Sequence, residues 1–188
     1  MSSDPTKWVQ EHGTIMYRFA ITRCSDAAVA ENLVQETFLA ALKSLASFSG
    51  RSSERTWLLG ILKHKLMDHY RKQVRERAVG DLEELPDDGT QMFDDSGKWT
   101  RRPSDWGNSP ESALESRDFR DILSECLAAL PPKQASVFRL REMDDLDTDE
   151  ICKELALSET NLWVLMHRAR ARLRQCLEKK WFADHREG

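Results

Sequence analysis

Hydrophobic positions in this chain repeat with helical spacing along most of its length. In the first part, apolar residues recur three or four positions apart in three segments, which places each set on one helix face. The polar stretch SGRSSERT separates the second segment from the third. We therefore expect three helices that close a small domain over residues 1–75. Their predicted buried stripes are Trp8, His12, Ile15 and Phe19; Val34, Phe38, Ala41 and Leu45; and Leu58, Ile61, Leu62, Leu66 and Tyr70.

The helical pattern stops over residues 76–110. Most of this segment reads DLEELPDDGTQMFDDSGKWTRRPSDWGNSP, which combines acids, glycines and prolines with few aliphatic residues. Such a composition buries too little apolar surface to form a core. We therefore expect a flexible acidic linker here.

Helical spacing resumes after the linker and predicts a second domain over residues 111–188. Ser109 and Pro110 suit the cap and first position of a helix with the stripe Phe119, Leu123, Cys126 and Leu130. Pro131 and Pro132 then end that helix and open the next. Asp147 and Ser158 can cap two short-coupled helices, an arrangement typical of a helix-turn-helix. The predicted fold is all-α, with two small helical domains joined by the linker.

The last predicted helix has two unlike faces when its residues are placed at 100° intervals. One face is apolar and should be buried: Leu162, Leu165, Met166, Ala169, Leu173, Cys176 and Leu177. The opposite face holds Trp163, Val164, His167, Arg168, Ala171 and Gln175, and further arginines flank it. A recognition helix reads base edges with its first turns while cations beside it hold phosphates. The alternative is that Trp163 packs on a neighbouring helix and the arginines only solvate a surface.

Charge is unevenly distributed, although the net value is only -4. Residues 76–115 are strongly acidic, residues 142–159 are acidic, and residues 168–180 are basic. Local fields steer ligands more than an average charge does, so a basic last helix remains compatible with DNA binding. The overall acidity nevertheless argues against tight DNA binding by the free chain.

The four cysteines are far apart and show no metal-ligand spacing. Since each falls in an apolar helical pattern, we expect buried free thiols rather than disulfides, with no metal site and no cofactor. The first residues lack the features of a signal peptide, and no apolar run reaches membrane-spanning length. These features indicate a reduced, cytosolic protein.

Four motifs occur in a fixed order: AENLVQETFLAAL (30–42), SSERTWLLGILKHKLMDHYRK (52–72), LPPKQ (130–134) and DEICKELALSETNL followed by HRARARL (149–173). Together they resemble the extracytoplasmic function (ECF) sigma factors, the smallest branch of the sigma-70 family. The resemblance implies a bacterial, cytoplasmic transcription-initiation subunit without enzymatic activity. It would bind core RNA polymerase, direct promoter recognition and initiate DNA opening for a stress- or signal-responsive regulon. Residues 1–75 would be sigma region 2, and residues 111–188 would be sigma region 4.

The resemblance also implies three sets of binding residues. The first set docks on the clamp helices of the largest polymerase subunit: Asn32, Gln35 and Glu36. Region 4 would meet the flap of the second subunit. The second set recognises and melts the minus-ten element: Phe48, Arg51, Trp57, Lys63, His64 and Arg71. Phe48 and Trp57 fit a buried stripe equally well. The third set reads the minus-thirty-five element: Ser158, Asn161, Trp163, Val164, His167, Arg168 and Arg170.

Relatives often carry a basic residue and a serine where this chain has Trp163 and Val164. We therefore expect apolar contacts, such as thymine methyls, and a distinctive upstream motif. The family implies promoter DNA and an anti-sigma factor, often membrane-bound, as further partners, with no small-molecule substrate. Acids between Asp81 and Asp95 would mimic nucleic acid in the polymerase cleft, although a passive tether is equally compatible.

Two other classes of function fit less of the chain. A stand-alone helix-turn-helix regulator explains the last helix but leaves the segments LVQETF and RTWLLGI unexplained. An enzyme fits least, because the sequence shows no Ser/His/Asp set, no phosphate-binding glycine loop and no zinc spacing. His64 and Asp68 are better interpreted as a surface pair than as a catalytic dyad.

Overall fold

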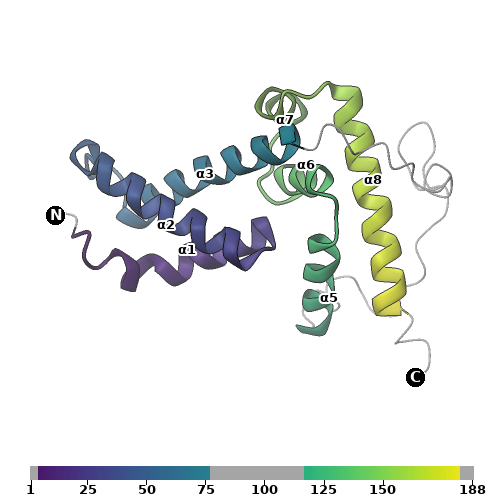
Figure 1. Cartoon of the computed structure of the whole chain (residues 1–188), viewed down its shortest axis with the longest axis horizontal. Helices are drawn as coiled ribbons and strands as arrows, with labels where there is room; N and C mark the ends of the chain where they lie inside the picture. The colour runs from purple at the N-terminus through teal and green to yellow at the C-terminus, as the bar shows by residue number, and fades with distance from the viewer. Residues whose placement is uncertain (1–3, 77–116, 183–188) are drawn as a thin grey trace. The chain divides into compact units, whose positions relative to one another are not determined.

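The computed structural model describes residues 4–76 and 117–182, and these residues form helices joined by short turns (Figure 1). The chain divides into two compact units, Met1–Lys72 and Gln73–Gly188. The predicted all-α fold is confirmed. The predicted acidic linker, apart from residue 76, and the predicted cap at Ser109 and Pro110 lie outside the described residues.

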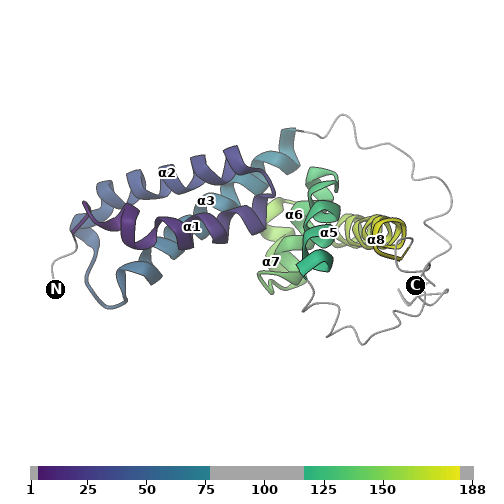
Figure 2. The same cartoon turned by 90° about the horizontal axis from the view of Figure 1, so that it is seen from below.

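The first unit is built from α1 (Trp8–Cys24), α2 (Ala27–Ser44) and most of α3 (Glu54–Glu76), whose last four residues fall in the second unit. A 3₁₀ turn, η1 (Leu45–Ser47), follows α2. Figures 1 and 2 both show α1 and α2 side by side. Asp26 begins α2 by accepting a hydrogen bond from the backbone N–H of Val29 at 3.0 Å. The hydroxyl of Tyr70 on α3 donates to the carbonyl oxygen of Arg23 at 3.0 Å, which ties α3 to the end of α1.

The core of the first unit follows the predicted stripe most closely on α3. Four side chains of that stripe are buried: Leu58, Leu62, Leu66 and Tyr70. On α1 the prediction is only partly right. Trp8 is buried, but Ile15 and Phe19 are half-buried, and the remaining core positions are Met16, Ala20 and Cys24. Because α1 contacts both α2 and α3, its buried face is rotated about the helix axis relative to the face that periodicity selects.

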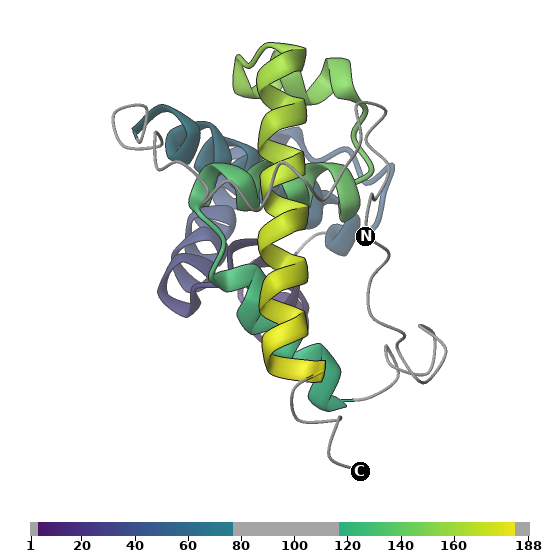
Figure 3. The ribbon, with the colours of Figure 1, turned by 90° about the vertical axis from the view of Figure 1, so that its right-hand side faces the viewer.

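The second unit contains α5 (Arg117–Ala128), α6 (Pro132–Glu142), α7 (Thr148–Leu155) and α8 (Glu159–Leu177), and a π-helical turn, η3 (Glu178–Phe182), follows α8. Figure 3 shows α8 lying across α6, with α7 near its start and α5 near its end. Pro132 occupies the first turn of α6, as predicted. The core includes residues of α5, α6 and α8 together with Leu130 from the turn between α5 and α6: Cys126, Leu130, Ala135, Ala169 and Leu173.

The expectation of four free thiols is wrong for one pair. Cys126 on α5 and Cys176 on α8 form a disulfide with a Cα–Cα distance of 5.8 Å. Periodicity placed both on buried faces, but only the packing of α5 against α8 brings those faces together. Neither Cys24 nor Cys152 forms a disulfide, and the Cys24 thiol donates to the carbonyl oxygen of Ala20 at 3.1 Å. Burial, and then the carboxylates of Glu159 and Asp149, raise the pKa of the Cys152 thiol, which disfavours its reactive thiolate form.

Candidate nucleic-acid interface

A tight turn couples α7 to α8 and fixes the direction of the second helix. Ala156 ends α7 in the left-handed conformation, with φ 53° and ψ 47°, and the backbone N–H of Leu157 returns to the carbonyl oxygen of Cys152 at 3.0 Å. Ser158 then caps α8 by accepting the backbone N–H of Asn161 at 3.2 Å. The predicted cap is confirmed, and the Ser158 hydroxyl is thereby engaged as an acceptor.

The start of α7 is equally well defined by local hydrogen bonds. The Asp147 carboxylate accepts the backbone N–H of Glu150 at 2.8 Å, and the Glu150 carboxylate accepts that of Asp147 at 3.0 Å. This reciprocal capping box satisfies two amides that a helix start otherwise leaves unpaired. It confirms the predicted cap and fixes the residue at which α7 begins.

The first turns of α8 expose two large apolar side chains. Trp163 is 60% exposed and Val164 is 40% exposed, which confirms that both point outward. His167 and Arg168 follow on the same side and are half-buried, and the Asn161 side chain is exposed. The prediction was wrong for Ala171, which is fully buried. A helical wheel gives the angle of each residue around the helix axis, but it contains no information about which neighbouring helices cover that residue.

His167 lies in an environment that favours its neutral form. Partial burial, and then the positive charges of Arg168 and Arg170, lower the pKa of its imidazole. A neutral imidazole has one donor and one acceptor nitrogen, so it can read a base edge by hydrogen bonding. His167 is therefore suited to direct contact with a base rather than to charge pairing with a phosphate.

The flanking arginines of α8 make ion pairs within the unit. Arg170 donates to Glu142 on α6 at 2.9 Å, and Arg174 donates to Glu178 at 2.7 Å. An exposed ion pair such as that of Arg170 with Glu142 contributes about 0–1 kcal/mol to stability. Breaking the pair of Arg170 with Glu142 therefore costs little, so the guanidinium can exchange partners.

The two aromatic candidates for the minus-ten element form a cluster inside the first unit. The rings of Phe48 and Trp57 lie 4.7 Å apart between centroids, and Trp57 meets Trp8 edge-on at 5.8 Å. Both candidates are half-buried. Each thus packs against the core while keeping some surface accessible, which agrees with both of the roles considered from the sequence.

The polar candidates around this cluster are better exposed. Arg51 lies in the loop that precedes α3, beside Gly50, whose positive φ of 69° suits glycine. Lys63 and His64 are exposed on α3. Arg71, further along α3, is half-buried and pairs with Asp68 at 2.7 Å. The structure therefore brings Arg51 and the aromatic cluster to the start of α3, while Arg71 lies several turns away.

The exposed side of α2 carries the predicted docking residues. Asn32 and Gln35 are exposed, and Glu36 is half-buried, with a hydrogen bond from Asn32 at 3.4 Å and an ion pair with Lys65 at 3.2 Å. Leu39, which is 58% exposed, continues this face together with exposed Leu42. The sequence prediction missed these two leucines. Their spacing from Asn32 and Gln35 along the helix could have indicated them.

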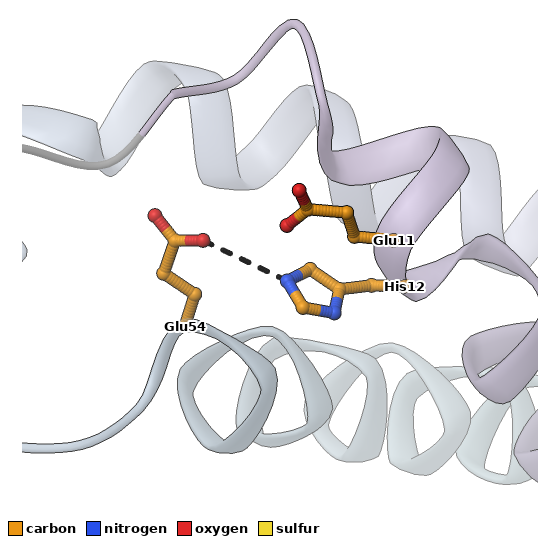
Figure 4. Close-up of side chains that lie close together, drawn as sticks. All are labelled: Glu11, His12 and Glu54. Atoms are coloured by element: carbon orange, nitrogen blue, oxygen red, sulfur yellow. Dashed lines mark ion pairs between the residues drawn. The ribbon is translucent and has the colours of Figure 1, made fainter.

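One further group of side chains lies outside these surfaces. Glu11, His12 and Glu54 offer ligand atoms that all lie within 4.8 Å of one another (Figure 4). Spacing along the sequence did not indicate that these three side chains meet, and the expectation of no metal site stays a prediction.

Within the two described stretches, none of the helices combines the length and apolar character that a membrane span requires.

Two family models match the chain: Sigma-70 region 2 over residues 8–76 and Sigma-70, region 4 over residues 120–173. A probable RNA polymerase sigma factor of Haemophilus influenzae is 38% identical over 174 residues, which cover 92% of this chain and 89% of that protein.

Two further proteins are similar along most of the chain. The ECF RNA polymerase sigma factor SigX of Bacillus subtilis is 30% identical over 87% of this chain and 78% of its own. The sigma factor RpoE, solved in complex with the anti-sigma factor NepR from Bartonella quintana, aligns with a TM-score of 0.44 and 21% identity. That alignment covers 93% of this chain and 97% of the other.

Proposed function

Since this chain belongs to the extracytoplasmic function branch of the sigma-70 family of RNA polymerase sigma factors, we propose that its two units act together at a promoter. Both units bind core RNA polymerase. The first unit binds the clamp helices of the largest polymerase subunit, and the second unit binds the flap of the second polymerase subunit. The second unit reads the minus-thirty-five element, and the first recognises and opens the minus-ten element. Polymerase supplies the effective concentration that lets two weak DNA-binding surfaces act as one.

The observation that carries this proposal is the exposure of Trp163 and Val164 at the start of α8. Two large apolar side chains in water are costly unless a partner covers them, and thymine methyl groups in the major groove are such a partner. His167 and Arg168 continue the same surface one turn later, with a neutral imidazole for a base edge and a guanidinium for a base or phosphate. The upstream element is therefore read largely by apolar contact at its first positions.

A promoter selected from a randomised library by run-off transcription with core polymerase provides the test. Trp163→Ala should weaken discrimination against upstream mismatches by about 5- to 30-fold, or about 1–2 kcal/mol, and change the footprint. Its folding should be little changed because the side chain is exposed. Val9→Ala, which shortens another exposed apolar side chain in the first unit, is the matched control and should leave selection unchanged. An unchanged footprint and selection for Trp163→Ala would refute this role.

Polymerase docking is proposed for the exposed side of α2. Asn32 and Gln35 supply hydrogen-bonding groups, Glu36 supplies a charge, and Leu39 adds apolar surface beside them. An aspartate introduced at position 39 would lose its hydration when polymerase binds and would gain no charged partner in return, which is costly. Leu39→Asp should therefore abolish capture of core polymerase, whereas Val9→Asp should not. Retention of polymerase by Leu39→Asp would exclude this face, and failure of the wild-type chain to bind would exclude the function.

DNA opening is proposed for the start of α3 and the loop before it. Arg51, Lys63 and His64 would contact the DNA backbone, and the accessible edges of the Phe48 and Trp57 pair would receive an unstacked base. Such stacking contributes about 1–3 kcal/mol per base, which offsets much of the cost of unpairing. Arg71 would hold phosphate further along the helix after exchange of its pair with Asp68.

Regulation by an anti-sigma factor, often membrane-bound in the family, is the remaining part of the proposal. Such a partner would cover the exposed side of α2 and so exclude polymerase. No small-molecule substrate and no catalytic activity of the chain itself are involved. The site of action is the bacterial cytoplasm, where RNA polymerase meets promoter DNA.

A further inference from the structure

His12 has a ring nitrogen that the protein itself leaves without a hydrogen bond. Its Nε2 atom is buried and has no hydrogen-bond partner, and the Oε2 atom of the Glu54 carboxylate lies 3.6 Å away. Figure 4 shows Glu54 and Glu11 approaching the imidazole from two different helices. Buried polar atoms are satisfied in most proteins, so an orphaned nitrogen that faces two carboxylates points to a missing partner.

The separation of these atoms suits a metal ion better than a hydrogen bond. Two ligand atoms that are each about 2.0–2.2 Å from a tetrahedral Zn²⁺ lie about 3.4 Å apart. The observed 3.6 Å between His12 Nε2 and Glu54 Oε2 is close to that value, whereas a hydrogen bond would be shorter. All three ligand atoms lie within 4.8 Å of one another, and the Glu11 side chain is exposed.

We propose that Glu11, His12 and Glu54 bind a divalent transition-metal cation, such as Zn²⁺. One imidazole and two carboxylates favour Zn²⁺ over Mg²⁺ or Ca²⁺, which prefer oxygen ligands alone. Three protein ligands leave a coordination position for water. Both carboxylates would be neutralised by the ion, and the orphaned nitrogen would gain a partner.

Local structure already holds two of the three ligands in place. Ser53 accepts the backbone N–H of Thr56 at 3.2 Å and begins α3, so that Glu54 stands on its first turn. His12 lies in the second turn of α1, and its side chain is 14% exposed, compared with 28% for Glu54. The backbone that carries each of these two ligands is helical.

The position of this site connects it to the minus-ten surface. Trp8 precedes His12 by one turn of α1, and Trp57 follows Glu54 by one turn of α3, and these two indoles are in contact. A cation between His12 and Glu54 would thus clamp α1 to the start of α3 beside Phe48 and Trp57. It would restrict the loop that carries Arg51. This consequence rests on the proposed function, whereas metal binding itself does not.

The site is tested by titrating the full-length, chelator-treated protein with Co²⁺, which reports its ligands through visible absorption. The expected result is one bound ion without the charge-transfer band of a cobalt thiolate, and a higher melting temperature with Zn²⁺. His12→Gln and Glu54→Gln should weaken binding by roughly tenfold or more. Glu11→Gln tests the same site without disturbing packing because Glu11 is exposed. Glu31→Gln, an exposed acid on α2, is the control and should bind normally.

Three outcomes would overturn the proposal. They are the absence of a Co²⁺ spectrum at millimolar metal, a spectrum that survives both His12→Gln and Glu11→Gln, and a thiolate band that indicates binding at a cysteine. In the first case the contact of His12 with Glu54 is an ion pair only. Polymerase capture by the wild-type chain, measured in parallel, separates failure of this site from failure of the proposed function.

Discussion

Reduction of the disulfide between Cys126 and Cys176 should destabilise the second unit while leaving the first almost unchanged. The bond closes a ring with a sequence separation of 50 residues and joins α5 to the end of α8. The Cys126 thiol would remain in the core cluster that includes Leu130 and Leu173, and the half-buried Cys176 would remain packed against it, so reduction removes a covalent link without opening a cavity. The effect therefore comes mainly from the unfolded chain, which gains freedom when the ring opens.

The size of the effect follows from the length of that ring. Loop-closure entropy for about 50 residues is about 14 cal/mol/K, or about 4 kcal/mol at 25 °C. Measured disulfides commonly contribute about 2–4 kcal/mol, because the unfolded chain is not a random coil. Since 1 kcal/mol shifts the melting temperature of a small domain by about 4–8 °C, the second unit should melt about 10 °C or more lower when reduced.

Hydrogen exchange on the full-length chain, with and without a reducing agent, separates the two units. Peptides from α5 and α8 should lose protection on reduction, and peptides from α1 should not. The Cys126→Ala, Cys176→Ala double variant should behave as the reduced protein under both conditions, whereas Cys152→Ala should respond as the wild type does. A loss of less than about 1 kcal/mol, or a double variant that still responds to reductant, would refute the reasoning.

Three further changes have expected outcomes. Leu62→Ala should cost about 2–5 kcal/mol in urea denaturation because Leu62 is fully buried, while exposed Leu42→Ala should stay within about 0.5 kcal/mol; equal losses would contradict the assigned core. Asp147→Ala should remove about 1 kcal/mol and the exchange protection of the Glu150 amide, and full protection in this variant would show that the cap is dispensable. The pKa of His167 is lowered in the folded chain, so stability should fall as the pH drops below 6.5, the ordinary pKa of histidine. The fall should be smaller in His167→Gln, and parallel curves of melting temperature against pH for the two proteins would disprove the shift.

The features that could be predicted from the sequence depend on neighbours within one or two helical turns. Ser158 and Asp147 start helices because their side chains reach amides three residues ahead, and that contact needs no distant partner. Pro132 opens α6 for a similarly local reason. The outward direction of Trp163 follows from 3.6 residues per turn together with a strongly apolar opposite face.

Predictions failed or were incomplete where two helices meet. Whether Phe48 and Trp57 are core or binding residues depends on Trp8, which lies on another helix and packs edge-on against Trp57. Ala171 was assigned to the surface, although it is buried in the folded unit. The exposed Leu39 was overlooked, since an apolar residue beside an apolar stripe is assumed to be buried until the packing is known.

Helical periodicity, caps and motif order are properties of the chain alone, because periodicity and caps depend on residues three or four apart and motif order is part of the sequence itself. The pairing of Cys126 with Cys176 and the approach of Glu54 to His12 are of another kind. Each requires residues far apart in sequence to share one point in space, and that depends on which helix faces pack together. Side-chain spacing along the chain carries no information about such an encounter, so these two sites became visible only in the folded structure.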